Sequence, residues 1–396
     1  MPILFAIVLI DLIGFGIVIP LLPFYGIHFG AGSFAVATMM ASYSLLQLVA
    51  APLWGRLSDQ YGRRPILILS LIGSVASYLW LGFADALWML FAARALQGAM
   101  AGNIAAAQAY IADVTPPERR AKGMGLIGAA FGLGFVIGPA LGGSFAGATP
   151  TAADLAHTAF LGAGLSALAL LGALLVLKES LPPHLRNKVR RGRIEAVLRS
   201  LRRPSLRFFI LLFFLTVTAF AAMETTFGYW AYDRFGWGPR QVGYLFTYVG
   251  VLGAVIQGSQ IGPLTRRFGE ERLLLAGTII ILVGLAGIPV SGGVPLVIAA
   301  SGCLAIGMSL TQPSLNSLIS RCAGADEQGE VLGVAQSAGS LARVLGPAVG
   351  GFLFDHLGRN APYLAGAALM AIVVLLGVRF LRQEGPVLAA RPTRAP

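Results

Sequence analysis

Charged side chains are scarce in this sequence. Only 12% of its 396 residues are Asp, Glu, Lys or Arg, and 56% are apolar, whereas an ordinary soluble domain is about 25% charged. The surface of such a chain must face something other than water, and a lipid bilayer is the only large apolar solvent in a cell. The composition therefore excludes an ordinary soluble protein and predicts a membrane protein.

Cysteine and histidine are also rare, with two and four residues. Cys303 and Cys322 lie 19 residues apart on one predicted helix, which separates them by about 28 Å, beyond the reach of a disulfide. The four histidines fall in predicted loops, so no metal site is expected. The sequence also lacks a phosphate-binding loop and a nucleophile motif. These absences argue against an enzyme, against a cofactor and against ATP as the energy source.

Twelve long apolar stretches are present instead. Each has the roughly 20 residues that an α-helix needs to cross a hydrocarbon core of about 30 Å, and none alternates apolar and polar residues as a transmembrane barrel does. The sequence therefore predicts an all-α integral membrane protein with twelve transmembrane helices. The expected spans are 3–25, 34–54, 65–84, 87–112, 122–146, 157–177, 208–231, 240–261, 273–290, 294–320, 330–354 and 361–380.

Lys and Arg are distributed unevenly between the loops. If the N-terminus is cytoplasmic, the opposite loops hold only Arg234, Arg240 and Arg359. Because basic loops stay in the cytoplasm, we expect both termini there. The net charge of +12 follows helix ends rather than a folded basic face, so it indicates topology and no nucleic-acid partner. The Arg, Ala and Gly bias with little Lys is typical of a bacterial inner (plasma) membrane.

The longest polar stretch, residues 178–207, divides the predicted helices six and six. The predicted organisation is an N-terminal bundle over 1–177, this cytoplasmic basic linker, a C-terminal bundle over 208–381 and a cytoplasmic tail over 382–396. Residues 192–201 form either a short basic helix on the lipid surface or part of a solvated tether.

Two motifs recur at a shift of about 208 residues. Residues 55–62 match residues 262–269, and the glycines and proline of 138–143 match those of 346–351. A parallel duplication predicts a pseudo-two-fold axis along the membrane normal, with a substrate site between the halves near the midplane. This arrangement indicates a transporter.

Residues 55–67, GRLSDQYGRRPIL, resemble the signature loop of the major facilitator superfamily. Its two glycines permit a tight turn, and Asp59 suits a helix N-terminus, where the dipole favours an anion. The resemblance implies a latch between the halves, with Asp59 at the start of helix 11 and Arg63 paired with Asp113. The alternative is a tight basic loop without a latch. The residues of this gating loop are Gly55, Asp59, Gly62, Arg63, Arg64 and Asp113.

Predicted helix 5 contains GLGFVIGPALGG at 132–143. Gly134, Gly138 and Gly142 form one stripe without side chains, which favours close helix packing, and Pro139 can bend the helix. With Gly143, these residues resemble the antiporter motif of the superfamily, which implies exchange rather than symport. Ordinary small-residue packing is the alternative.

Helix 1, IDLIGFGIVIPLLPFYG, and helix 4, LFAARALQGAMAGN, are similar to those of the 12-helix drug:proton antiporters. The chain resembles the tetracycline-exporter-like subgroup most. It departs from that subgroup because predicted helix 9 has no acidic residue and helix 8 has no histidine. This departure argues against tetracycline itself as the substrate.

Four charges lie well inside predicted spans, where an ionised side chain costs at least ~2.5 kcal/mol and normally faces a partner or a wet cavity. These candidates for proton coupling are Asp11, Arg94, Glu224 and Arg343. The resemblance implies that Arg94 takes part in proton coupling, by stabilising an ionised acid or by replacing its proton. A permanent structural ion pair is the alternative for Asp11 and Arg94. Arg343 could pair with either acid or with an anionic substrate.

Glu224 lies among aromatic and thioether residues, a setting that suits a lipophilic cation. The alternative is an acid that reaches into an outer vestibule. Uncharged polar residues in the spans either line the cavity or hold helices together. The candidate cavity residues are Phe15, Gln47, Gln108, Tyr110, Met223, Phe227, Trp230, Gln257, Gln312, Asn316 and Gln336.

These features predict a secondary active transporter of the multidrug efflux type. It would export an amphipathic small molecule by alternating access, in exchange for protons, with the proton gradient as its energy source. Its partners would be the substrate, protons and the bilayer, and we expect a monomer. Two rivals remain: a proton symporter or facilitator for a metabolite, and a non-transporting membrane sensor.

Overall fold

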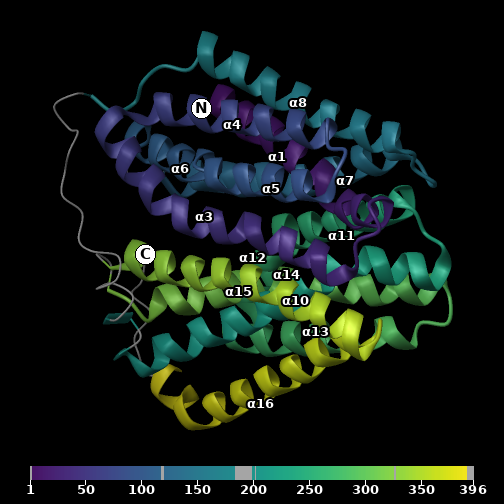
Figure 1. Ribbon diagram of the computed structural model, residues 1–396. Helices are drawn as coiled ribbons and strands as arrows, with labels where there is room; N and C mark the ends of the chain where they lie inside the picture. Colours follow the sequence, from purple (N-terminus) through teal and green to yellow (C-terminus); the bar gives the residue numbers. More distant parts are fainter. Residues whose placement is uncertain (1, 117–119, 183–198, 201, 325–326, 390–396) are drawn as a thin grey trace. The chain divides into compact units, whose positions relative to one another are not determined.

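The computed structural model describes residues 2–116, 120–182, 199–200, 202–324 and 327–389 (Figure 1). Every regular element in these ranges is a helix. Ten helices there are long and apolar enough to cross a membrane. The two remaining expected spans are helix 4, which is broken, and α15 (Gln328–Leu357), which is more polar.

The first half contains α1 (Pro2–Val18), the 3₁₀ turn η1 (Ile19–Leu21), α2 (Leu22–His28), α3 (Ser33–Tyr61), α4 (Arg63–Gly82), α5 (Leu87–Met100), α6 (Asn103–Val114), α7 (Arg120–Ala146) and α8 (Ala152–Leu175). The second half contains α10 (Pro204–Phe235), α11 (Pro239–Val255), the π-helical turn η4 (Ile256–Gln260), α12 (Ile261–Phe268), α13 (Glu270–Val290), α14 (Val294–Arg321), α15 and α16 (Ala361–Ala389).

Three expected spans are interrupted. Helix 1 tightens into η1 at Pro20, which cannot donate a backbone hydrogen bond. Helix 8 contains the π turn η4. Helix 4, predicted as one span over 87–112, is instead two helices separated by Ala101 and Gly102. Hydropathy shows a continuous apolar run across each break, so it does not reveal them.

One boundary also differs from the predicted organisation, and one predicted helix is not tested. Helix α16 extends to Ala389, past the expected start of the tail at 382, because helical backbone bonding continues beyond the apolar residues. The predicted basic helix over 192–201 lies almost wholly outside the described residues.

The loops that the internal repeat aligns share one backbone feature. Gly62, between α3 and α4, has φ of 111°, and Gly269, between α12 and α13, has φ of 78°. Only glycine adopts these angles without strain. The shared conformation supports the duplication inferred from the sequence.

By contacts, the described chain groups into two compact units. The first contains residues 1–192, 221–254 and 343–362, and the second contains 193–220, 255–342 and 363–396. Parts of α10, α11 and α15 therefore belong with the first-half helices. The expected division into two six-helix bundles stays a prediction.

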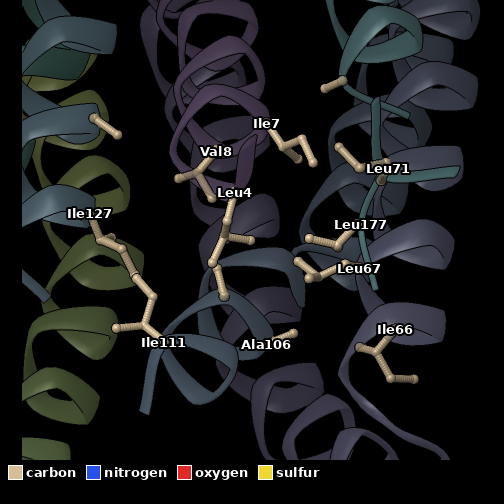
Figure 2. Close-up of a cluster of buried hydrophobic side chains, with 14 of the residues drawn as sticks. Leu4, Ile7, Val8, Ile66, Leu67, Leu71, Ala106, Ile111, Ile127 and Leu177 are labelled. Carbon is tan, nitrogen blue, oxygen red and sulfur yellow. The ribbon is translucent and has the colours of Figure 1, made fainter. Parts of the chain in front are cut away.

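An apolar cluster forms the core of the first unit. It joins α1, α3, α4, α6, α7 and α8, and Figure 2 shows most of its side chains. Leu4, Ile7, Val8 and Leu12 contribute one face of α1, which fixes the rotation of that helix. In the second unit, Gly277 lets α13 approach the backbone of α14 at Gly307. Small residues at such contacts are typical of helix packing in membranes.

Candidate proton and substrate site

Helix α1 places Asp11 against α4, α6 and α8. The side chain is 8% exposed. Asn103 Nδ2 donates a hydrogen bond to Asp11 Oδ2, and Ser166 Oγ lies 3.5 Å from Oδ1. Ser74 also donates a side-chain hydrogen bond to the carboxylate. Asp11 is therefore held by neutral donors from three helices.

The break between α5 and α6 brings Asn103 to this position. Gly102 lies against the Trp54 side chain, because a Cβ at Gly102 would be 2.6 Å from the indole Cγ. Trp54 Nε1 in turn donates to the Ala99 carbonyl at 2.6 Å, which satisfies a group near the break. Asn103 is then the first residue of α6. Non-helical backbone at membrane depth is tolerated where protein groups satisfy it in this way.

Arg94 on α5 is 3% exposed and lies beside aromatic rings. Its guanidinium is 4.5 Å from the Tyr43 ring centre and 5.9 Å from that of Phe15. Nη1 donates to Gln97 Oε1, whereas Nε has no hydrogen-bond partner in the described part of the chain. Among the described residues, neither Arg94 nor Asp11 forms an ion pair. A direct structural bridge between them is therefore absent from this conformation.

Glu224 and Arg343 lie in the first unit, on α10 and α15. Arg343 is close enough to Glu224 and to Tyr43 to interact electrostatically with both. Glu224 is half-buried and Arg343 is exposed.

The aromatic and thioether residues near Glu224 pack as core. Met223, Phe227 and Trp230 are 7%, 1% and 1% exposed. Trp230 Nε1 donates to Asn360 Oδ1 at 2.9 Å, and Phe227 lies 5.9 Å from the Phe246 ring. These three side chains offer little surface to a substrate in this conformation, and their place in the substrate cavity stays a prediction.

The gating loop forms a charged cluster around Arg63. Arg63 Nη1 lies 2.6 Å from Asp59 Oδ1, and Nε lies 2.9 Å from Asp113 Oδ2. Glu179, at the start of the linker, accepts hydrogen bonds from the backbone N–H groups of Arg63 and Arg64 at 2.8 and 3.2 Å. The Glu179 carboxylate thus caps the N-terminus of α4. The N-cap residue of that helix, Gly62, has no side chain that could do so. The contact expected between Asp59 and the start of helix 11 stays a prediction.

The glycine stripe of α7 packs on α1, as its spacing predicts. A Cβ at Gly138 would lie 2.6 Å from Gly16 Cα, and one at Gly134 would lie 2.8 Å from Leu12 Cβ. Gly142 faces the Ile17 backbone in the same way. The stripe thus seats α7 directly against the helix that carries Asp11.

Helix α7 also packs on α11 at the end of the unit opposite the gating loop. A Cβ at Gly143 would lie 2.8 Å from the Pro239 carbonyl oxygen, and one at Gly250 would lie 2.9 Å from the Phe135 carbonyl oxygen. Thr247 Oγ1 donates to the Val136 carbonyl at 3.3 Å. The two repeats therefore touch through backbone at this end.

The start of α3 is fastened at the same end. Asp355 Oδ1 accepts a hydrogen bond from Ser33 N at 3.2 Å, and Oδ2 accepts one from Phe34 N at 2.9 Å. Tyr229 Oη donates to the Ala31 carbonyl at 2.9 Å. Gly32, the N-cap of α3, supplies no side chain, so α3 receives its cap from α15.

The remaining polar candidates are divided between the two units, and their place in a shared cavity stays a prediction. In the first unit Gln47 donates to Tyr43 Oη at 3.4 Å, Tyr110 is half-buried and Gln108 is exposed. The second unit contains the other four candidates, of which Gln257 and Gln336 are exposed. The remaining two are Gln312 and Asn316.

Sequence reasoning missed Asn103, Ser166, Tyr43, Glu179 and Asp355. The Gly102–Asn103 pair within the apolar run of helix 4 was the one available local signal of a break.

Long apolar helices, close contacts through glycine and buried charges on facing helices define a polytopic membrane transporter. The chain belongs to the Major Facilitator Superfamily, whose family model matches residues 4–346 and 260–396. That family consists of transporters rather than enzymes.

Relatives and solved structures agree with this assignment. The chain is 33% identical over 358 residues to "Tetracycline resistance protein, class C" of Escherichia coli, covering 86% of each chain. It is 30% identical to "Multidrug resistance protein 2" of Bacillus subtilis (strain 168), covering 95% of this chain and 93% of the relative. The structure of the human organic anion transporter MFSD10 (TETRAN) is similar with a TM-score of 0.71 and 26% identity, covering 95% of this chain and 98% of that one.

Proposed function

We propose that this chain exports an amphipathic small molecule in exchange for protons. The observation that carries the proposal is the buried Asp11 carboxylate, which neutral donors hold and no described cation pairs. A carboxylate permanently paired with a cation would resist protonation, whereas one held by neutral donors can gain and lose a proton. An ionisable group at such a position is expected to be functional.

Two further observations support export by exchange. The curated relatives at 30% identity or more include proteins that carry tetracycline or multidrug resistance in their names. The α7 glycine stripe packs on the helix of Asp11, so a change at the proton site can move α7. Since α7 also contacts α11, protonation and closure share one rigid element.

The substrate class follows from the surroundings of Arg94. Phe15 lies 5.4 Å from the Tyr43 ring and 6.3 Å from the Phe135 ring. Such a cluster suits an apolar or aromatic body, while nearby charge favours a polar end. The absence of an acid from the apolar span 273–290 of helix 9 and of a histidine from helix 8 argues against tetracycline itself.

The transport cycle we propose uses the contacts at the outer end. We infer from the basic loops that the gating loop is cytoplasmic, so the α7–α11 and α3–α15 contacts lie on the outer side. With these contacts made, substrate enters from the cytoplasm. Rocking of the halves then opens the outer side, and an external proton binds Asp11 or Glu224 as substrate leaves.

The test uses purified protein in liposomes with an internal pH dye and an imposed proton gradient. Lipophilic cations, neutral drugs and tetracycline are added separately. We expect substrate-dependent proton movement that Asp11→Asn abolishes, with Glu224→Gln tested in parallel to identify which acid carries the proton. Unaltered proton-coupled export by folded Asp11→Asn would remove Asp11 from the mechanism, and the absence of proton movement with every compound would favour a facilitator or sensor.

Arg94 favours a second candidate, the transport of an organic anion. Its buried guanidinium has no carboxylate partner among the described residues and keeps Nε without a hydrogen bond. The similar human structure is named as an organic anion transporter. A fluorescent organic anion in the same liposomes distinguishes the two, because uptake that Arg94→Gln abolishes would make the anion the substrate.

A further inference from the structure

Asn103 is oriented by its own helix. Its Oδ1 accepts a hydrogen bond from the backbone N–H of Ile104 at 2.9 Å. An amide has one oxygen and one NH₂ group, so the NH₂ group must face Asp11 Oδ2, as the hydrogen bond between them shows. The side chain can therefore only donate to this carboxylate.

The break in helix 4 adds to this effect. Because α6 begins at Asn103, the amide that holds the carboxylate stands at the positive end of a helix, the end that favours an anion. A continuous helix 4 would carry Asn103 within its hydrogen-bonded interior, away from a free N-terminal turn. The positions of the break and of the amide together give an ionised Asp11 the donors that water would otherwise supply.

We propose that Asn103 is a positioning residue for the proton site, which holds the ionised Asp11 carboxylate after its proton has left. This inference rests on the proposed role of Asp11 in proton exchange. Asn103 occupies Oδ2, so the proton binds Oδ1, which faces Ser166 Oγ. When the proton leaves Oδ1, the bond from Asn103 to Oδ2 is already in place, and no cation needs to approach.

Other groups near Asp11 also influence its charge. Tyr43 on α3 and Tyr78 on α4 lie near enough to interact electrostatically with both Asp11 and Arg94. Ser74 on α4 and Ser166 on α8 donate to the carboxylate, and the part of α7 packed on α1 near Asp11, with Gly134 and Gly138, carries no titratable side chain. None of these groups is altered by a substitution at Asn103.

The test is the pH profile of substrate-driven proton movement in liposomes, measured for wild type, Asn103→Leu and Asn103→Ser. Removing a donor to a carboxylate favours its protonated form, so Asn103→Leu moves the midpoint upward by about one pH unit. Asn103→Ser keeps a donor and shifts the midpoint less. Thr158→Ala is the matched control, because Thr158 is buried on α8 and its one hydrogen bond to a described residue goes to the Asp154 carbonyl of its own helix; the midpoint of this variant stays unchanged.

A structural role alone would lower the transport rate or the melting temperature without moving the midpoint, and that outcome overturns the proposal. If Asn103→Leu does not fold, Asn103→Ser decides by the same criterion. If Asp11→Asn keeps proton-coupled transport, the proposed function is wrong and the positioning role is lost with it. Loss of coupling in Asp11→Asn with an unmoved midpoint in both Asn103 variants refutes only the role of Asn103.

Discussion

Arg203 binds Glu327 through both terminal nitrogens, at 2.6 and 3.0 Å. This pair joins the end of the linker to the turn before α15. The hydrogen bonds from Arg203 lower the pKa of the Glu327 carboxyl and raise the pKa of the guanidinium. Because the pKa of Glu327 is lowered, its carboxylate is ionised and the ion pair is fully formed above the ordinary glutamate pKa of about 4.3. The ion pair is lost as the pH falls through the lowered pKa.

Glu327→Gln should therefore loosen the start of α15 at pH 7. Hydrogen exchange of residues 328–334 would be faster than in wild type by less than about fivefold, because solvent-exposed pairs are weak. Wild type should match the variant only in acid, below the ordinary glutamate range. Glu270→Gln removes a different pair, with Arg321 at 3.0 Å, and should leave this exchange unchanged. Equal exchange in Glu327→Gln and wild type at pH 7 would contradict the prediction.

The candidate residues that sequence could identify are those that stand out locally. Asp11 and Arg94 are charges in apolar runs, and the structure buries both. Asn103 and Asp355 are ordinary residues in sequence, and they matter because of partners 92 and 322 residues away. A polar residue that acts through a distant partner leaves no local pattern, so it becomes visible only in the fold.

Helix contacts through glycine give a sharp prediction at the scale of elements. A Cβ at Gly138 of α7 would lie 2.6 Å from Gly16 Cα, and this neighbour is backbone that cannot rotate away. Gly138→Ala should force α1 and α7 apart and destabilise the fold by about 1–3 kcal/mol, as overpacking does. On the same helix, a Cβ at Gly132 meets nothing within 4 Å, so Gly132→Ala is the matched control. Thermal unfolding in detergent compares the two, and equal melting temperatures would count against the packing argument.

The N-terminus of α3, which Asp355 of α15 caps, gives a second prediction at this scale. Asp355→Ala leaves two backbone N–H groups without their acceptor, which costs about 1 kcal/mol and should open this contact about fivefold more often. A cysteine at Ser33, which is 2% exposed, reports the opening by reaction with an impermeant maleimide, after Cys303 and Cys322 are replaced by serine. Asp154→Ala removes a cap within α8 itself and should not change the labelling rate. Unchanged labelling in Asp355→Ala would show that the cap does not hold the contact closed.

At the scale of the elements, hydropathy predicted nearly every helix but missed their internal breaks. The apolar run of helix 4 continues through Ala101 and Gly102, while the backbone does not. The break depends on Trp54, which packs on Gly102 and binds the Ala99 carbonyl from another helix. A pattern within one segment cannot contain such a cause.

For the whole molecule, the duplication predicts two halves, while contacts group 221–254 and 343–362 with the first half. The sequence is the same in every conformation, so it predicts the repeat but not which contacts a given state makes. The contacts between the repeats at this end are therefore a property of one state. Transport by alternating access requires that they separate.

A reversible crosslink across these contacts tests that requirement. Ser144 Oγ of α7 lies 3.2 Å from Tyr244 Oη of α11, and both side chains are exposed, so cysteines at these two positions are within reach of a short bifunctional methanethiosulfonate reagent. The variant Ser144→Cys with Tyr244→Cys, in a background with Cys303 and Cys322 replaced by serine, should transport before crosslinking, lose transport with the reagent and regain it with dithiothreitol. Each single cysteine variant should keep its transport when the same reagent is added. Full transport by protein whose crosslink is verified by mass spectrometry would mean that this end stays closed throughout the cycle, so that substrate must leave by another route.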